Sequence, residues 1–521
     1  MSTTNKSALF LLVLTCLSLL LPASCQKQQT LFPELDMEQD ISPQITDDTT
    51  KTEPIQSESE DKPVHLHLAV PFEDETAEAL RLLFLAFDSG LLNKEDHQQI
   101  GQMVSLDDLK QFDAPFVLEI ETVPAATGIT AEQVRTWAAA ANMPDVMYTG
   151  SAASIPGLSY LLPLNEFLFE NERLSPDHLF TVSIKAASSG RVLYGIPYLA
   201  STPMICYNAD LLSSIGASYP DFSQTFAKWA DWMKDVQQKL SERGLCPDLE
   251  DLELIDDPDS RPLLFENAIF LYEQLSDFLP FIAPSGSWAS GWGQWDGKGF
   301  NLDDPVFSSS AAWLREQALS TFSLYHLSES ERQLVRNDLK GQAVHRVIGR
   351  VIDSADLSYW FALDAFRVCV SLMPVYYSED LSEEDLKMRF PVYVRCLSVW
   401  RETRYPELAV RFSSFIAQDP DSLLMQSRFQ IYDGLFPLIR DSTVWDAMVS
   451  RQPYGKDLRV FETFLPFAYT GGQQTVRSWD KIMDEAFRQE GDRYLSSSDD
   501  EQAAAFLKLK KTIQRIYQEG G

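Results

Sequence analysis

The sequence predicts an α/β protein built on a parallel, doubly wound sheet. Three short segments have the apolar pattern of strands: residues 64–70, 116–123 and 145–148. Between them, residues 75–87 and 130–141 repeat apolar side chains at the spacing of a helix. Strand, helix, strand, helix, strand is typical of a parallel sheet with helices on its faces.

Each of these elements has its own local signal. Residues 64–70 alternate apolar and polar side chains, as a strand with one buried face does. Thr130 is a suitable N-cap for the second helix, and Glu132 lies in its first turn. In parallel sheets ligands bind beyond the carboxyl ends of the strands, and Tyr148 and Thr149 lie at the end of the third strand. We therefore expect both residues to contact a ligand.

Composition excludes several classes of protein. The chain has 521 residues, of which 45% are hydrophobic and 12% aromatic, so it can form a large core and is not globally disordered. Its length predicts two or more domains. With 76 acidic and 43 basic residues the net charge is -33, which would repel nucleic acid and anionic lipid headgroups. No GxGxxG or Walker motif indicates a nucleotide cofactor, and we expect no cofactor.

Residues 1–24 have the pattern of a secretory signal peptide. A lysine precedes an apolar stretch over residues 8–21, and small residues follow before Cys25. This end resembles a bacterial lipobox, although Pro22 replaces the usual leucine. The pattern predicts export to the periplasm or cell surface and a lipid anchor on Cys25. Ordinary cleavage at the same boundary, without a lipid, is the alternative.

Residues 25–63 are predicted to be a flexible acidic tether. Between residues 26 and 63 there are ten acidic residues and three lysines, with no sustained strand or helix period. Such a segment cannot bury enough apolar surface to offset its conformational entropy. It would join the lipidated cysteine to a folded body over residues 64–521.

The cysteines and histidines do not indicate a metal site or a catalytic base. Cys206, Cys369 and Cys396 lie in apolar stretches and are predicted to be buried free thiols, with one or two disulfides as the alternative. His65 and His67 share one face of a strand, but no third ligand is placed nearby. No GxSxG or HExxH motif occurs, so we expect no metal and no catalytic residues.

A series of motifs resembles the family 1 extracellular solute-binding proteins of ABC importers, the group that contains maltose-binding protein. The best match is Tyr194-Gly-Ile-Pro197 followed by Tyr207-Asn-Ala-Asp-Leu-Leu212, with Cys206 in place of the first tyrosine of the family's Tyr-Tyr-Asn. The further matching segments are, in order, residues 140–146 with Pro-Asp-Val, 161–165, 273–324, 405–416 and 434–437. Together they run across nearly everything after residue 64.

The resemblance implies a two-lobe periplasmic-binding-protein fold, type II-like, with discontinuous lobes joined by hinge crossings. The expected lobes are lobe 1, about 64–200 plus 385–432, and lobe 2, about 201–384 plus 433–521. We place the crossings near Ser201, around residues 374–391 and around residues 431–436. The lobes would close on a ligand in the cleft between them.

The resemblance also implies a substrate-binding protein that is not an enzyme. It would be a monomer that captures a carbohydrate or similar polar solute and delivers it to ABC permease subunits. Sugar sites combine aromatic side chains, which cover the ring face, with polar groups for the hydroxyls. The further ligand-binding residues that we predict are Tyr198 at the first crossing, Trp288, Trp292 and Trp295 in a Gly/Ser-rich segment, Trp360, and Tyr469.

Alternatives remain at the level of residues and of the whole chain. The three tryptophans of the Gly/Ser-rich segment could instead pack a surface loop onto its own lobe. Tyr207 and Asn208 are expected to stabilise a strand-to-helix turn, and Trp445 and Trp479 to pack on helices. For the whole chain, the alternatives are a secreted carbohydrate-active enzyme and an interaction lipoprotein that kept the fold but lost uptake.

Overall fold

The structure is a computed structural model, and all the residues that it describes belong to one compact unit, residues 62–521. The described residues are 63–88, 116–125, 128–150, 158–168, 178–221, 225–243, 300, 302–303, 305–320, 348–357, 367–374, 391–429, 434–451, 459–470 and 478–520. The predicted signal peptide and, apart from Pro63, the predicted tether lie outside them.

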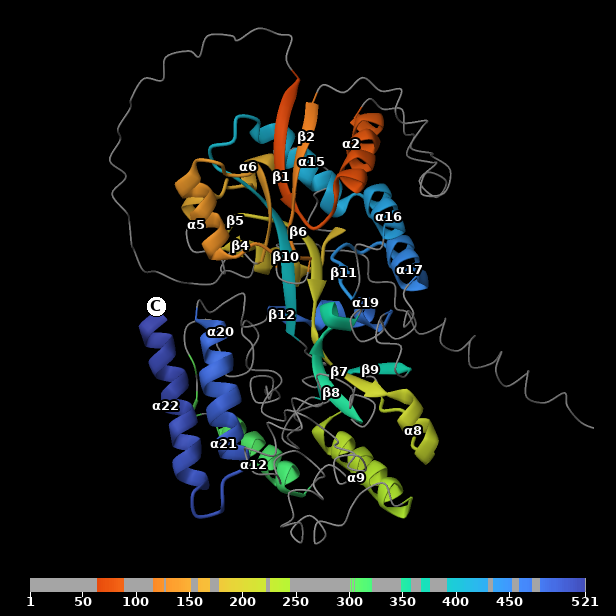
Figure 1. Ribbon diagram of the computed structural model, residues 1–521, viewed down its shortest axis with the longest axis vertical. Helices are drawn as coiled ribbons and strands as arrows, with labels where there is room; N and C mark the ends of the chain where they lie inside the picture. Colours follow the sequence, from red (N-terminus) through yellow and green to blue (C-terminus); the bar gives the residue numbers. More distant parts are fainter. Residues whose placement is uncertain are drawn as a thin grey trace, which may run out of the picture. The chain divides into compact units, whose positions relative to one another are not determined.

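The first sheet has seven strands in the order β11-β6-β10-β3-β1-β2, with β12 paired to β10 (Figure 1). The strands are β1 (Val64–Val70), β2 (Phe116–Thr122), β3 (Val146–Thr149), β6 (Ile196–Ser201), β10 (Pro391–Val399), β11 (Phe436–Pro437) and β12 (Tyr469–Thr470). Strands β1, β2 and β3 are parallel, as predicted. Strand β10 runs antiparallel to both β3 and β6, so the complete sheet is mixed. The local strand-helix pattern could not predict this antiparallel pairing, because β10 begins more than 240 residues after the end of β3.

Helices with one apolar face cover this sheet. They are α2 (Asp74–Asp88), α5 (Ala131–Ala140), α6 (Asn165–Leu168), α7 (Thr181–Ala187), α15 (Pro406–Gln418), α16 (Pro420–Arg428), α17 (Ser442–Arg451) and α19 (Val460–Phe464). The predicted N-cap is confirmed, because the Thr130 hydroxyl accepts from the backbone N–H of Gln133 in a capping box. Phe84 of α2 packs edge-on against Phe116, Phe412 and Phe415, with ring centroids 5.3 to 6.2 Å apart. This cluster joins α2 and α15 to β2.

The second sheet is antiparallel, with the order β8-β7-β9. Its strands are β7 (Pro203–Asn208), β8 (Gly349–Asp353) and β9 (Val368–Leu372). The helices of this part are α8 (Ala209–Ile215), α9 (Phe226–Glu242), α12 (Pro305–Ser320), α20 (Trp479–Lys481), the π-helix η11 (Ile482–Glu490), α21 (Gly491–Leu495) and α22 (Gln502–Gly520). The Tyr207 ring packs edge-on against Trp232, and its hydroxyl lies 3.0 Å from that of Ser371.

Short elements complete the described chain. They are the hairpin β4 (Ser188–Ser189) with β5 (Val192–Leu193), and the 3-10 helices η2 (Leu158–Tyr160), η8 (Ser354–Asp356) and η9 (Leu465–Phe467).

Two apolar clusters form the core of the described part, and the second sheet packs one face in each of them. The first contains the core of β1, β3, β6 and β10, and the second contains α9, α12, α22 and one face of β7. Apolar side chains of β11, α17, α19 and η9 belong to the first cluster, whereas the sequence predicts these segments in lobe 2. The second cluster gains its C-terminal part from Trp479 onward. The predicted packing of Trp445 and Trp479 is confirmed, since both are buried.

Several residues of the recognised motifs stabilise turns and close approaches. The Asp145 carboxylate accepts from the backbone N–H of His67 at 2.9 Å and from the Thr403 hydroxyl at 2.5 Å, so it joins three segments. Asn208 caps α8 through the N–H of Leu211, as the sequence predicts. A Cβ on Gly195 would lie 2.6 Å from the Cβ of Cys396, so only glycine lets β6 begin this close to β10.

Candidate functional site at the passages between the sheets

The chain passes directly from the first sheet to the second at Thr202. Strand β6 ends at Ser201 in the first sheet, and β7 begins at Pro203 in the second. Thr202, between them, is fully buried. This passage lies where the sequence predicts the first crossing.

Two further passages connect the first sheet to the second sheet and to the second cluster. Strand β9 ends at Leu372 in the second sheet and β10 begins at Pro391 in the first, with residues 375–390 outside the described part. The last passage follows β12, because the chain enters the second cluster at Trp479. The sequence predicts another passage around residues 431–436, but the described elements on either side of it, α16 and β11, both pack in the first cluster.

The three passages meet one another. The Thr202 hydroxyl donates to the carbonyl oxygen of Pro391 at 2.7 Å. Pro391 in turn pairs with Tyr469 of β12. The start of β10 therefore adjoins the first and third passages, and a relative movement of the two sheets must bend the chain here.

Tyr148 and Thr149, the predicted ligand contacts at the end of β3, are buried beside β10. The Tyr148 hydroxyl donates to the carbonyl oxygen of Ala125 at 2.9 Å, and burial raises the pKa of this phenol. The Thr149 hydroxyl lies 2.9 Å from that of Ser398. Ligand contact at these two residues remains a prediction that requires their exposure in another arrangement.

Tyr198 is also buried, and it connects β6 to α16. Its ring packs edge-on against Tyr148, with centroids 5.9 Å apart, and its hydroxyl donates to Gln426. The Gln426 amide donates to the carbonyl oxygen of Ile416 at 2.7 Å and to the Ser422 hydroxyl at 3.0 Å. Tyr198 therefore holds the strand that leads into the first passage.

Arg395 is a candidate functional residue that no sequence pattern above predicts. Its guanidinium is buried in β10, donates to the carbonyl oxygen of Tyr393 at 2.8 Å, and lies 3.5 Å from the Ser201 hydroxyl. It stands next to Cys396, where burial raises the thiol pKa to about 12 even though the guanidinium acts to lower it. The sequence signal for this residue is that Arg395 is the single charged residue in the apolar segment Pro391–Val399.

Of the predicted aromatic contacts that the structure describes, Tyr148 and Tyr198 are buried, whereas Tyr469 is partly exposed. It is half-buried on β12 and packs against the second cluster, although its strand belongs to the first sheet. The other predicted residues, Trp288, Trp292, Trp295, Trp360 and Cys25, lie outside the described residues.

The remaining titratable groups of the described part form no metal-binding cluster of three or more His, Cys, Asp or Glu residues. The His67 imidazole has Glu121 at 3.8 Å. Cys206 and Cys396 are buried thiols, as predicted, whereas the Cys369 thiol is partly exposed. Among the described helices, none is both long and apolar enough to cross a bilayer.

Comparison with known proteins supports the fold but not a sequence family. No protein-family model matches the chain, and no curated protein matches it either. Solved structures do match over 88% of the chain. They include an ABC substrate-binding protein from Listeria monocytogenes in complex with cycloalternan, with 13% identity, 99% of that chain covered and a TM-score of 0.57.

Two further structures agree with the first. The cyclic alpha-maltosyl-1,6-maltose binding protein from Arthrobacter globiformis has 14% identity, 100% of its chain covered and a TM-score of 0.57. The sugar-binding protein MalE from Xanthomonas citri has 14% identity, 98% of its chain covered and a TM-score of 0.54. The chain has the fold of the ABC-transporter sugar-binding proteins. The predicted two-lobe α/β fold class is thereby confirmed.

Proposed function

We propose that the protein is the substrate-binding component of an ABC importer, that it captures a carbohydrate and delivers it to the permease, and that it makes or breaks no covalent bond. One observation supports this most directly: 88% of the chain shares its fold with proteins described as binding cycloalternan, cyclic maltosyl-maltose and other sugars. Three adjoining passages join the first sheet to the second sheet and to the second cluster, and they supply the architecture for closure on a ligand.

In this proposal, lobe 1 contains the first sheet and its helices, and lobe 2 contains the second sheet with α20 to α22. The predicted aromatic residues would cover the sugar ring. Tyr469 is well placed for this role among the described residues, because it is half-buried where the passages adjoin. Trp288, Trp292, Trp295 and Trp360 would supply further ring contacts, and Tyr148, Thr149 and Tyr198 would contribute where closure exposes them.

A binding experiment tests the proposal. The protein would be screened by thermal unfolding against maltotetraose, cycloalternan, cyclic maltosyl-maltose and tagatose, with calorimetry of each hit. A ligand at one hundred times its Kd should stabilise the fold by about 2.7 kcal/mol, because it binds the folded state alone. Absence of stabilisation by every carbohydrate in a broad panel would contradict a carbohydrate-binding function.

A matched pair of variants tests the position of the site. Tyr469→Ala should weaken binding of a hit about tenfold, since one aromatic contact contributes on the order of 1 kcal/mol. Tyr219→Ala removes an equally large side chain that is 52% exposed on the surface before α9, and should leave Kd unchanged. Equal affinities in both variants would place the site away from β12.

We further propose that the chain is exported and anchored through a lipid on Cys25. The charged, apolar and small segments of residues 1–24 and the acidic tether support this. In a bacterial host, Cys25→Ser should move the protein from the membrane fraction to the soluble fraction and abolish labelling by a fatty-acid analogue. Unchanged fractionation would contradict the anchor without affecting the proposal for sugar binding.

A further inference from the structure

A direct backbone contact connects the first-sheet part to the second-sheet part beside the passages. Gly434, just before β11, has φ of +71°, the left-handed region that favours glycine. A Cβ at this position would overlap the carbonyl oxygen of Ser354 and lie 2.7 Å from its carbonyl carbon. Ser354 begins η8, immediately after β8 of the second sheet. Glycine is therefore required for the backbone before β11 to touch the backbone that follows β8.

The Ser354 turn is in turn bonded to the first passage. Its backbone N–H donates to the carbonyl oxygen of Thr202 at 2.8 Å, and the Thr202 N–H donates to the Ser354 hydroxyl at 3.1 Å. Both residues are fully buried, so these bonds do not compete with water. The Thr202 hydroxyl continues the chain of contacts to Pro391. A displacement of Ser354 must therefore displace the passage.

We propose that the contact between Gly434 and Ser354 is a mechanical stop that sets the resting arrangement of the two sheets, with Thr202 as the pivot. Because the two backbones already touch, the Ser354 turn can rotate away from Gly434 but not further toward it. Relative movement of the two sheets away from the resting arrangement is therefore possible in one direction only. That this movement serves ligand capture rests on the proposed function; the stop itself does not.

The stop has a consequence for affinity. A ligand that prefers one arrangement binds with an apparent Kd that depends on how much of that arrangement is populated beforehand. A methyl group at residue 434 would force the Ser354 turn away and change that population. Any change in apparent Kd should then follow the change in the unliganded population.

Distance measurements on the unliganded protein test the stop. Spin labels on Arg135→Cys in α5 and Lys234→Cys in α9, both exposed positions, report the separation of the two parts, and the chain without the added cysteines gives the background. Gly434→Ala should shift the mean distance. Gly216→Ala is the matched control, because Gly216 has φ of +70° but nothing within 4 Å of an added Cβ. A Gly434→Ala distribution that coincides with the parent and with Gly216→Ala overturns the proposal.

A second variant covers the case in which Gly434→Ala does not fold. Ser354→Ala keeps the carbonyl that touches Gly434 but removes the acceptor of the Thr202 N–H, so the distance distribution should broaden. Ser214→Ala removes an exposed serine hydroxyl on α8 and should leave the distribution unchanged. An unchanged distribution for Ser354→Ala overturns the proposal. Since no ligand is used, failure to bind any carbohydrate would count against the proposed function alone.

Discussion

At the scale of single residues, burial outweighs a neighbouring charge in the middle of the first sheet. The Arg395 guanidinium favours the ionised forms of Tyr148 and Cys396, yet burial raises the pKa of both groups. The Cys396 thiol therefore keeps its proton in the folded state up to pH of about 12, whereas its ordinary pKa is 9.0. The unfolded chain binds fewer protons than the folded chain between these values.

This difference predicts an alkaline loss of stability. Between pH 9 and 11 the free energy of unfolding should fall with pH, and Cys396 should contribute about 1 kcal/mol per pH unit to the slope. Cys396→Ala should flatten the slope by that amount, measured by urea unfolding across the pH range. The slope is compared rather than the level, because the cavity left by the missing sulfur lowers stability at every pH. Parallel slopes would contradict the predicted titration.

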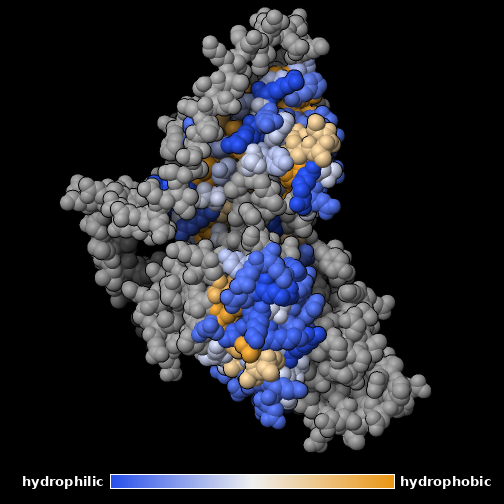
Figure 2. Space-filling model, turned by 90° about the vertical axis from the view of Figure 1, so that its left-hand side faces the viewer, coloured by the Kyte–Doolittle hydropathy of each residue, from blue (hydrophilic) through white to orange (hydrophobic). Residues whose placement is uncertain are grey.

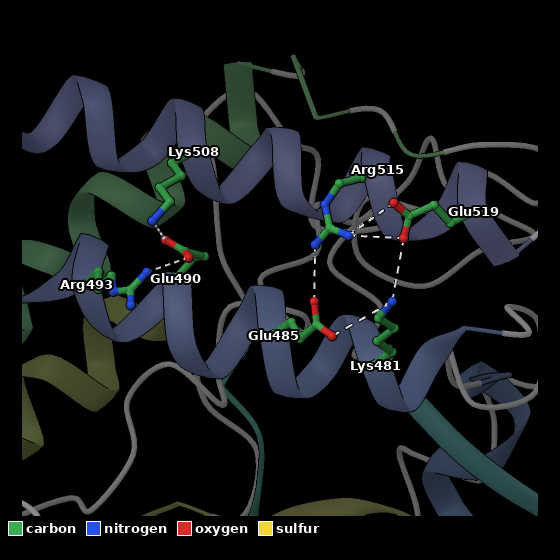
Figure 3. A network of polar contacts seen from close by, with 7 residues as sticks. All are labelled: Lys481, Glu485, Glu490, Arg493, Lys508, Arg515 and Glu519. Carbon is green, nitrogen blue, oxygen red and sulfur yellow. Dashed lines mark hydrogen bonds and ion pairs between the residues drawn. The ribbon is translucent and has the colours of Figure 1, made fainter.

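At the scale of elements, a network of charged side chains joins α22 to η11 and α21 (Figure 3). Glu490, with only 10% of its side chain exposed, accepts from Arg493 at 2.6 Å and from Lys508 at 3.1 Å. At the other end, Arg515 bonds both Glu485 and Glu519. Beneath these pairs, Leu509, Ile513 and Ile516 of α22 are buried in the second cluster. The apolar face of α22 supplies the buried surface, and the ion pairs favour one register of α22 against η11 and α21.

The two ends of this network should differ in their effect on stability. Glu490→Gln should lower the free energy of unfolding by about 1–2 kcal/mol, because two cations lose a poorly hydrated carboxylate. Glu519→Gln, at an exposed position, should have a smaller effect. Chemical denaturation of both variants measures the difference, and equal losses would contradict it.

The exposed end of the network should also respond to pH. Hydrogen bonds from Arg515 lower the pKa of Glu519 below its ordinary value, so the folded state favours the ionised carboxylate. The contribution of Glu519 to stability is therefore present at neutral pH and lost as the pH falls through that lowered pKa.

At the scale of the whole molecule, the described surface is mainly polar. On the face drawn in Figure 2 the hydrophobic residues form separate small patches among hydrophilic ones. The large hydrophobic side chains that are exposed in the described part come from different elements: Val117, Tyr160, Tyr219 and Leu507. Together with the net charge of -33 on the whole chain, this favours solubility of the protein.

The division of the chain gives a prediction at the same scale. Residues 62–521 form a compact unit by themselves. Removal of residues 1–61 should therefore leave the melting temperature of the body unchanged, as measured by calorimetry. A fall in Tm would show that the leading segment contributes packing to the folded body.

Local signals in the sequence were sufficient for the elements that local physics controls. The alternation in residues 64–70 and the Thr130 cap correspond to β1 and α5, because pleating and capping involve neighbours in the chain. The order of the motifs predicted two α/β lobes and the first passage. The structural role of Asn208 could also be predicted from the sequence, because an N-cap bonds a backbone N–H within three residues.

The position of the predicted site depended on pairing between distant segments. The segments around Tyr148 and Tyr198 are equally compatible with a ligand contact and with a core position. The two side chains are buried because β10 and α16, which are distant in the sequence, pack beside them. The packing of β11, α17 and α19 in the first cluster could not be predicted from the sequence either, because their apolar residues suit either core. Gly434 touches Ser354 across eighty residues of chain, and no local pattern records that contact. Sequence therefore determined the elements and their class, whereas tertiary packing determined which residues remain accessible and where the two parts meet.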